Sequence, residues 1–150
     1  MALDPSFVGR TYPPADPYTV GREKVREFAD AIGAFGAEDA AFRDLAAAKA
    51  VGHPDVIAPP TFAVVLASLA SRVLIDDPEL GLDFSRVVHG DQRFAYTRPI
   101  RAGDRLVCTV VVDEIMTRAG NDFLTTRTDV ATEDGEPVVQ VWTRLVVRAE

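Results

Sequence analysis

The stretch Ala58–Ile75, APPTFAVVLASLASRVLI, decides the fold that we predict for this chain. Its apolar residues recur at helical spacing, with small alanines and serines between them. Two prolines come first and Thr61 offers an N-cap oxygen, so we expect a buried helix over about Thr61–Ile75, enclosed by protein on nearly every side. The stretch is too short for a membrane span, which needs roughly 20 mostly apolar residues, and Arg72 lies within it.

Composition predicts one compact domain over residues 1–150. The chain is 47% hydrophobic and 26% charged, and its length supports one substantial core. The formal net charge of -7 argues against sequence-independent binding of nucleic acid, which depends on Lys and Arg at phosphates. No signal-like segment opens the chain, and the lone Cys108 lies in an alternating apolar run, so we expect a cytoplasmic protein with a buried structural thiol.

The second half of the chain reads as β structure. Alternation rich in Val, Thr and Phe predicts two short strands, two turns (Gly120-Asn121 and Asp134-Gly135) and three long strands. The expected strands are Phe84–His89, Gln92–Thr97, Arg105–Arg118, Phe123–Thr132 and Pro137–Arg148. An antiparallel sheet packed on one long helix is the economical α+β arrangement.

The first half of the chain contains segments that we expect to pack over that sheet. Residues Met1–Tyr18 contain four prolines, so this segment should lie extended on the surface. Gly21–Gly33 reads as a surface helix with one apolar face and Gly33 as its stop. On the strands, Trp142 and Phe123 are more typical of core or subunit interface than of a ligand site.

Three motifs carry a resemblance to a known family. The segments FVGRTYPP (Phe7–Pro14), GHPDVIAPPTF (Gly52–Phe62) and HGDQRFAYTRPIRAGDRL (His89–Leu106) resemble the MaoC-like hot-dog family of (3R)-hydroxyacyl thioester dehydratases and hydratases. The likeness covers essentially the whole chain and is closest to small actinobacterial, non-catalytic, substrate-binding subunits. It implies a hot-dog fold, a dimer with its two sheets side by side, and a tunnel for an acyl chain on coenzyme A (CoA) or acyl carrier protein (ACP).

The family's reaction needs a base for the proton beside the thioester carbonyl, an acid for the departing hydroxyl, and donors for the developing enolate oxygen. The first turn of the central helix can supply the donors, because its N–H groups lack partners within the helix. We therefore place the substrate-binding residues at that turn, with Thr61 as its cap. The alternative is that Thr61 only caps its own helix and binds nothing. These residues are Ile57, Ala58, Pro59, Pro60, Thr61 and Phe62.

The family's catalytic Asp and His have no match in this chain. Active members carry both in a Gly-Asp-x-Asn-Pro-x-His segment before the central helix. Matching backwards from Asp44 places Ala37 at the Asp and Phe42 at the His, and matching forwards from Gly33 places Ala34 at the Asp. The resemblance therefore implies no catalytic residue of the family type here.

Two other pairs are candidate acid–base couples. His53 and Asp55 precede the central helix, and His89 and Asp91 are also two residues apart, a spacing that points both side chains the same way on a strand. The alternatives are a loop-ordering role for His53 and Asp55 and a polar strand corner for His89 and Asp91. A tetrahedral metal site draws three or four protein ligands, so we predict no metal, and we expect no cofactor.

Three functions remain open. The first is the acyl-thioester-binding subunit of a heteromeric dehydratase, with the catalytic pair supplied by a hot-dog partner chain. The second is a non-enzymatic homodimeric acyl-thioester binding protein. The third is a self-sufficient homodimeric enoyl thioester hydratase that uses His53 or His89. All three imply an acyl-CoA or acyl-ACP ligand and at least a dimer, because so small a sheet leaves an open edge.

Overall fold

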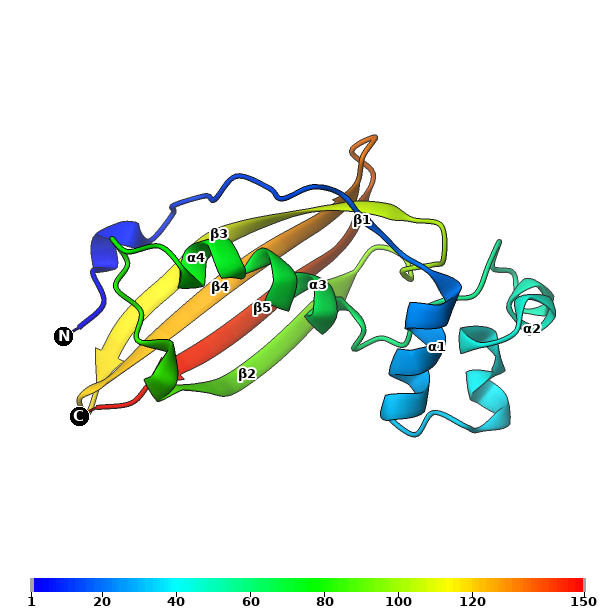
Figure 1. The fold of residues 1–150 in the computed structure, drawn as a ribbon, viewed down its shortest axis with the longest axis horizontal. Helices are drawn as coiled ribbons and strands as arrows, with labels where there is room; N and C mark the ends of the chain where they lie inside the picture. The colour runs from blue at the N-terminus through cyan, green and yellow to red at the C-terminus, as the bar shows by residue number, and fades with distance from the viewer. Residues whose placement is uncertain (1, 150) are drawn as a thin grey trace.

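Five antiparallel strands form one curled sheet in the computed structural model, which describes residues 2–149 (Figure 1). Their order is β1-β3-β4-β5-β2, so the three long strands form the expected meander at the centre. The α+β hot-dog expectation is confirmed. The strands are β1 (Tyr18–Thr19), β2 (Val87–Tyr96), β3 (Arg105–Arg118), β4 (Asn121–Thr132) and β5 (Pro137–Val147).

Strand β2 replaces the two short strands predicted from the sequence. Residues Phe84–Arg86 form a 3-10 turn, η3, because the Asp83 carboxylate accepts hydrogen bonds from the backbone and the hydroxyl of Ser85. The interruption expected between His89 and Gln92 is a β-bulge, and pairing with β5 continues on both sides of it. The prediction of a gap between two strands was therefore wrong.

The central helix is broken into α3 (Ala63–Ala70) and α4 (Arg72–Ile75). At the break the Ser71 hydroxyl donates to the carbonyl of Ala67 at 2.7 Å, a back-bond that commonly bends helices. Thr61 is exposed and is not the N-cap; Phe62 holds that position in a helical conformation, without a side-chain cap. Residues 59–62 already form a turn, so the extended conformation that a threonine cap requires is absent.

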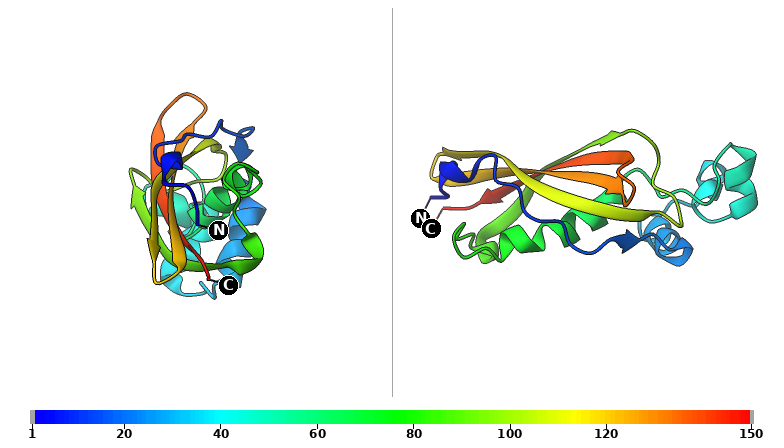
Figure 2. Two further views of the ribbon diagram at one scale, coloured as in Figure 1. Left: turned by 90° about the vertical axis from the view of Figure 1, so that its left-hand side faces the viewer. Right: turned by 90° about the horizontal axis from the view of Figure 1, so that it is seen from above.

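Protein encloses one side of this helical segment. Phe62, Leu66 and Leu74 are at most 1% exposed and pack against the concave face of the sheet. Leu69 and Val73 are 51% and 43% exposed on the other side. The expectation of enclosure on nearly every side was therefore wrong for a single chain, because one sheet covers one face of a helix (Figure 2).

The N-terminal segment lies along β3, as its prolines predict. Thr11 bridges Val111, and the Tyr12 N–H donates to the carbonyl of Val110 at 2.9 Å. The Tyr12 ring is buried, and its hydroxyl donates to Asp77 at 2.8 Å, just after α4. The segment therefore ties the outer edge of the sheet to the end of the central helix.

Residues 22–57 form an overhang beyond the end of the sheet opposite the two termini (Figures 1 and 2). It contains α1 (Arg22–Ala31), the 3-10 helix η2 (Ala37–Phe42) and α2 (Leu45–Ala50). The expected stop at Gly33 is confirmed by its φ of +72°, and the Phe28 ring packs edge-on against Phe62 at 5.4 Å. The overhang thus packs against the N-terminal end of α3.

The convex face of the sheet carries the two aromatics that the sequence favoured for core or interface. Trp142 and Phe123 are both half-buried there, and the Arg93 guanidinium lies 3.8 Å from the Trp142 ring centroid. Trp142 lines a hollow on this convex face with Arg93 and Arg144. No helix among residues 2–149 is long and apolar enough to cross a bilayer.

Candidate functional site

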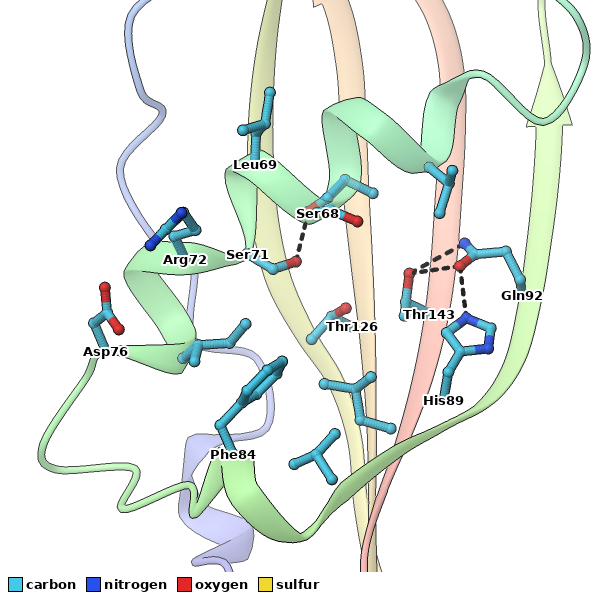
Figure 3. Close-up of a pocket in the computed structure, with 15 residues that line it drawn as sticks. Ser68, Leu69, Ser71, Arg72, Asp76, Phe84, His89, Gln92, Thr126 and Thr143 are labelled. Carbon is cyan, nitrogen blue, oxygen red and sulfur yellow. Dashed lines mark hydrogen bonds between the residues drawn. The ribbon is translucent and has the colours of Figure 1, made fainter. Parts of the chain in front are cut away.

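Two of the hollows formed by residues 2–149 lie beside the central helical segment and the loop that leads into it. The larger, which we call the helix groove, has a volume of about 680 Å³ and lies between the helical segment and strands β2, β4 and β5 (Figure 3). The smaller, the overhang pocket, measures about 530 Å³ and lies between the overhang, the chain entering α3 and the end of β2. Val64 lines the groove and Pro60 the pocket, about one helical turn apart, so an elongated ligand could contact both.

The helix groove is mostly apolar, but its floor holds a hydrogen-bonded cluster (Figure 3). The Gln92 amide nitrogen donates to the Trp142 carbonyl at 2.9 Å and to the Thr143 hydroxyl at 3.1 Å. The Gln92 amide oxygen lies 2.9 Å from Nε2 of His89. These contacts hold the Gln92 and His89 side chains against the groove, where Thr126 also lies.

The overhang pocket brings together parts of the chain that are far apart in sequence. Its walls come from η2, the loop before α3 and the β2–β3 turn. The loop is held by a hydrogen bond of 2.7 Å from the Ala58 N–H to the carbonyl of Ile100 and by a bridge between Ile57 and Arg101. Its lining residues include Glu38, Phe42, His53, Ile57, Ala58, Pro60 and Tyr96.

Tyr96 lies at the first turn of α3. Its hydroxyl donates to the carbonyl of Pro60 at 2.5 Å, and its ring stacks on Phe94 with centroids 6.2 Å apart. Burial raises the pKa of Tyr96 to about 12, against a smaller opposing effect of the Ala63 backbone N–H. The hydroxyl is therefore protonated at neutral pH, and the Pro60 carbonyl accepts its one proton. Sequence reasoning missed Tyr96, because only the packing of β2 against α3 brings it to this turn.

Comparison with known proteins decides the family. The family model described as "FAS1-like, dehydratase domain region" matches residues 6–141. The chain belongs to this family. A UPF0336 protein of Streptomyces coelicolor is 58% identical to this chain over 149 residues, which cover 99% of this chain and 97% of that protein.

Two solved structures extend the comparison. The HadBC (3R)-hydroxyacyl-ACP dehydratase complex of Mycobacterium tuberculosis contains a chain 31% identical, with a TM-score of 0.83, covering 97% of this chain and 99% of that one. A MaoC-like dehydratase is 32% identical with a TM-score of 0.86, covering 96% of this chain and 43% of that one. The resemblance to MaoC-like hot-dog dehydratases seen in the sequence motifs is confirmed.

The six residues predicted to bind substrate separate in the structure. Ile57, Ala58 and Pro60 line the overhang pocket. Pro59 is buried, Phe62 is part of the core, and Thr61 lies exposed next to the pocket rather than in its wall. Substrate contact therefore stays a prediction for Ile57, Ala58 and Pro60, and packing accounts for Phe62.

The positions matched to the family's catalytic pair also separate. Phe42, at the His position, lines the overhang pocket beside Ala58 and Pro60. Ala37 starts η2, and Ala34 follows α1, where its carbonyl accepts a hydrogen bond from Arg43. The residue that the motif match assigns to the family's His is therefore a phenylalanine in the wall of this pocket.

His53 and Asp55 make different contacts. Two hydrogen bonds of 2.9 Å join Arg22 to the Asp55 carboxylate and lower the pKa of that carboxyl group. Asp55 also accepts from the backbone N–H of Val56, which orders the loop. His53 lines the overhang pocket with Glu38, and no hydrogen bond between His53 and Asp55 occurs within residues 2–149.

The prediction that His89 and Asp91 point the same way was wrong. The bulge between them adds a residue, so His89 lines the helix groove and Asp91 lies beside Arg93 and Trp142 on the convex face. No cluster of three or more His, Cys, Asp and Glu side chains that could hold a metal ion occurs in the described part of the chain. Burial raises the pKa of the Cys108 thiol to about 11, so it is a poor nucleophile at neutral pH.

Proposed function

We propose that this chain binds the acyl thioester in a (3R)-hydroxyacyl-CoA or -ACP dehydratase and that a partner hot-dog chain supplies the catalytic Asp and His. The proposal is carried by the pocket at the first turn of α3, together with the motif match that assigns Phe42 and an alanine to the positions of the family's catalytic His and Asp. Its support includes the 31% identity to a chain of the HadBC dehydratase complex.

In this proposal the acyl chain lies in the helix groove and the thioester at the first turn of α3. The groove is lined mainly by apolar side chains, as an alkyl chain requires. At the turn, backbone N–H groups can donate to a polarised thioester oxygen, and the Tyr96 hydroxyl can do so only by giving up its bond to the Pro60 carbonyl. Proton transfer is left to the partner.

Enoyl-CoA hydration tests this division of labour. The purified chain alone should give no turnover, and activity should appear on mixing with a hot-dog chain that carries the intact Asp and His segment. Val64→Trp, which fills the groove, should weaken acyl-CoA binding in isothermal titration, whereas Val73→Trp, on the exposed side of the same helical segment, should not. Robust hydration by the lone chain would contradict the proposal.

A self-sufficient hydratase is the second candidate, because His53 lines the overhang pocket with Glu38 and Tyr96. In that case the lone chain hydrates enoyl-CoA, and His53→Ala abolishes turnover. His89→Ala provides the comparison, since His89 lies in the groove. Activity that survives both substitutions would exclude this candidate.

A further inference from the structure

An apolar row crosses the convex face of the sheet, near the end where the two termini lie (Figure 1). Its members pair directly across four adjacent strands: Met116 with Phe123, Phe123 with Val146, and Val146 with Val88. Directly opposite residues have Cβ atoms about 4.5–5.5 Å apart, so the four side chains form one strip, which we call the convex band. Met116 and Val88 are 42% and 43% exposed. Phe123 and Val146 are half-buried on the inner strands β4 and β5, at the ridge of the curved sheet.

The convex band faces away from the core. Its neighbours along β3, β4 and β5 include Ile115, Leu124 and Val147, which pack with Leu74 under the central helical segment. Because successive side chains of a strand point to opposite faces, the band lies on the solvent side. The helices of residues 2–149 lie on the other face of the sheet or beyond its end (Figure 2). A contiguous apolar strip left open in this way marks an interaction surface.

Charged rows of opposite sign flank the convex band. On the side of the termini, Arg118 and Arg148 follow Met116 and Val146 by two residues and form the basic row. On the other side lies the acidic row, with Glu114 and Asp91 at its ends. This row also holds Arg144, which donates to Glu114 at 3.1 Å, so one negative charge remains in excess. Arg118 and Asp91 make no hydrogen bond or ion pair with any residue in 2–149.

A second copy of the chain matches all three rows at once. A two-fold axis along the convex band lays the band of one copy on that of the other, and each basic row on the opposite acidic row. Arg118 then faces Glu114 of the second copy. Arg148 approaches Arg144 of the second copy, whose charge is offset by its own bond to Glu114. We propose that the convex band is a face-to-face interface between two copies of this chain.

The geometry of the sheet agrees with this arrangement. The axis keeps the strands of the two copies aligned, as in sheets that pack face to face. A partner surface of a single charge sign would match one flanking row and repel the other. The contact leaves the outer edge of β2 free, so it is separate from the side-by-side dimer implied by the family resemblance. It also needs no acyl ligand, and therefore does not depend on the proposed function.

Sedimentation equilibrium of the full chain, over a range of concentrations, tests the interface. Met116→Asp should halve the mass of the assembly, because it places a charge in the convex band. Val73→Asp is the matched control: Val73 is 43% exposed, as Met116 is 42% exposed, but it lies on the helical segment on the other face of the sheet, so the mass should be kept. A wild-type chain that stays monomeric, a Met116→Asp chain of wild-type mass, or an equal loss in both variants would overturn the proposal.

Exchange of charges tests the two-fold pairing of the rows. Arg118→Glu and Glu114→Lys should each weaken the association about tenfold, because the axis repeats every repulsive pair. An equimolar mixture of the two variants should associate more tightly than either variant alone, since opposite charges then meet at both pairs. Damage to the fold of either variant would not be repaired by mixing. A mixture that associates no better than its components would overturn the proposal.

Discussion

Arg98 offers a sharp test of how the wall of the overhang pocket is stabilised. Its guanidinium donates twice to the Asp104 carboxylate, at 2.9 and 3.0 Å, and also to Glu136 and to the carbonyl of Pro99. The Arg98 and Asp104 side chains are 15% and 7% exposed. This buried pair closes the turn between β2 and β3, from which Arg98 and Pro99 line the pocket.

Arg98→Met removes these bonds and keeps much of the apolar stem. Breaking one side of a buried ion pair costs about 3–5 kcal/mol, because the remaining charge stays buried. Asp104 keeps the Arg101 backbone N–H at 3.0 Å and the Arg101 guanidinium at 3.7 Å, so we expect the lower end, about 3 kcal/mol. For a chain of this size, that loss lowers the melting temperature by about 6–12 °C.

Urea unfolding, followed by the fluorescence of the single tryptophan, Trp142, measures the change. The midpoint should fall without a change in slope. Arg105→Met is the matched control, because Arg105 makes two comparable bonds to Glu133 at an exposed site, where ion pairs contribute little. Equal effects of Arg98→Met and Arg105→Met would refute the reasoning from burial.

Three further predictions follow from burial. Phe62→Ala should lower the free energy of unfolding by about 3–5 kcal/mol in urea titration, because the ring is fully buried. The Cys108 thiol should react slowly with a disulfide reagent at pH 8 and quickly in urea, because burial raises its pKa to about 11. Folding raises the pKa values of Tyr12 and Tyr96 from 10.0 to about 12, so the contribution of the two neutral hydroxyls to the stability of the fold is complete below pH 10 and is lost towards pH 12. The loss of stability at alkaline pH should therefore be smaller in the Tyr12→Phe and Tyr96→Phe variants.

The sequence predicted those parts of the fold that depend on local periodicity. The three long strands and the two turns between them follow from alternation and turn chemistry, and the structure confirms them. The helical stretch was also found, but its break at Ser71 was not. Serine occurs both within helices and at bends, and only the hydrogen bond to the Ala67 carbonyl distinguishes the two uses.

The candidate site was harder to predict, because it depends on contacts between distant segments. Ile57, Ala58 and Pro60 were found from the helix start, whereas Tyr96 joins them only through the packing of β2 on α3. The groove residues Thr126, Thr143 and Gln92 lie side by side only because of the register of three strands. Periodicity within one strand carries no information about which residue lies opposite it on the next.

The bulge between His89 and Asp91 changes which residues of β2 lie on which face of the sheet. Even and odd positions exchange faces at this point, so the odd-numbered His89 and the even-numbered Gln92 both reach the groove. Gly90 suits the crossing, because a Cβ atom there would lie 3.0 Å from the Val146 side chain and 3.3 Å from the Arg144 carbonyl. Deleting this one residue would restore strict alternation and leave His89 and Gln92 two positions apart, still on the same face of β2.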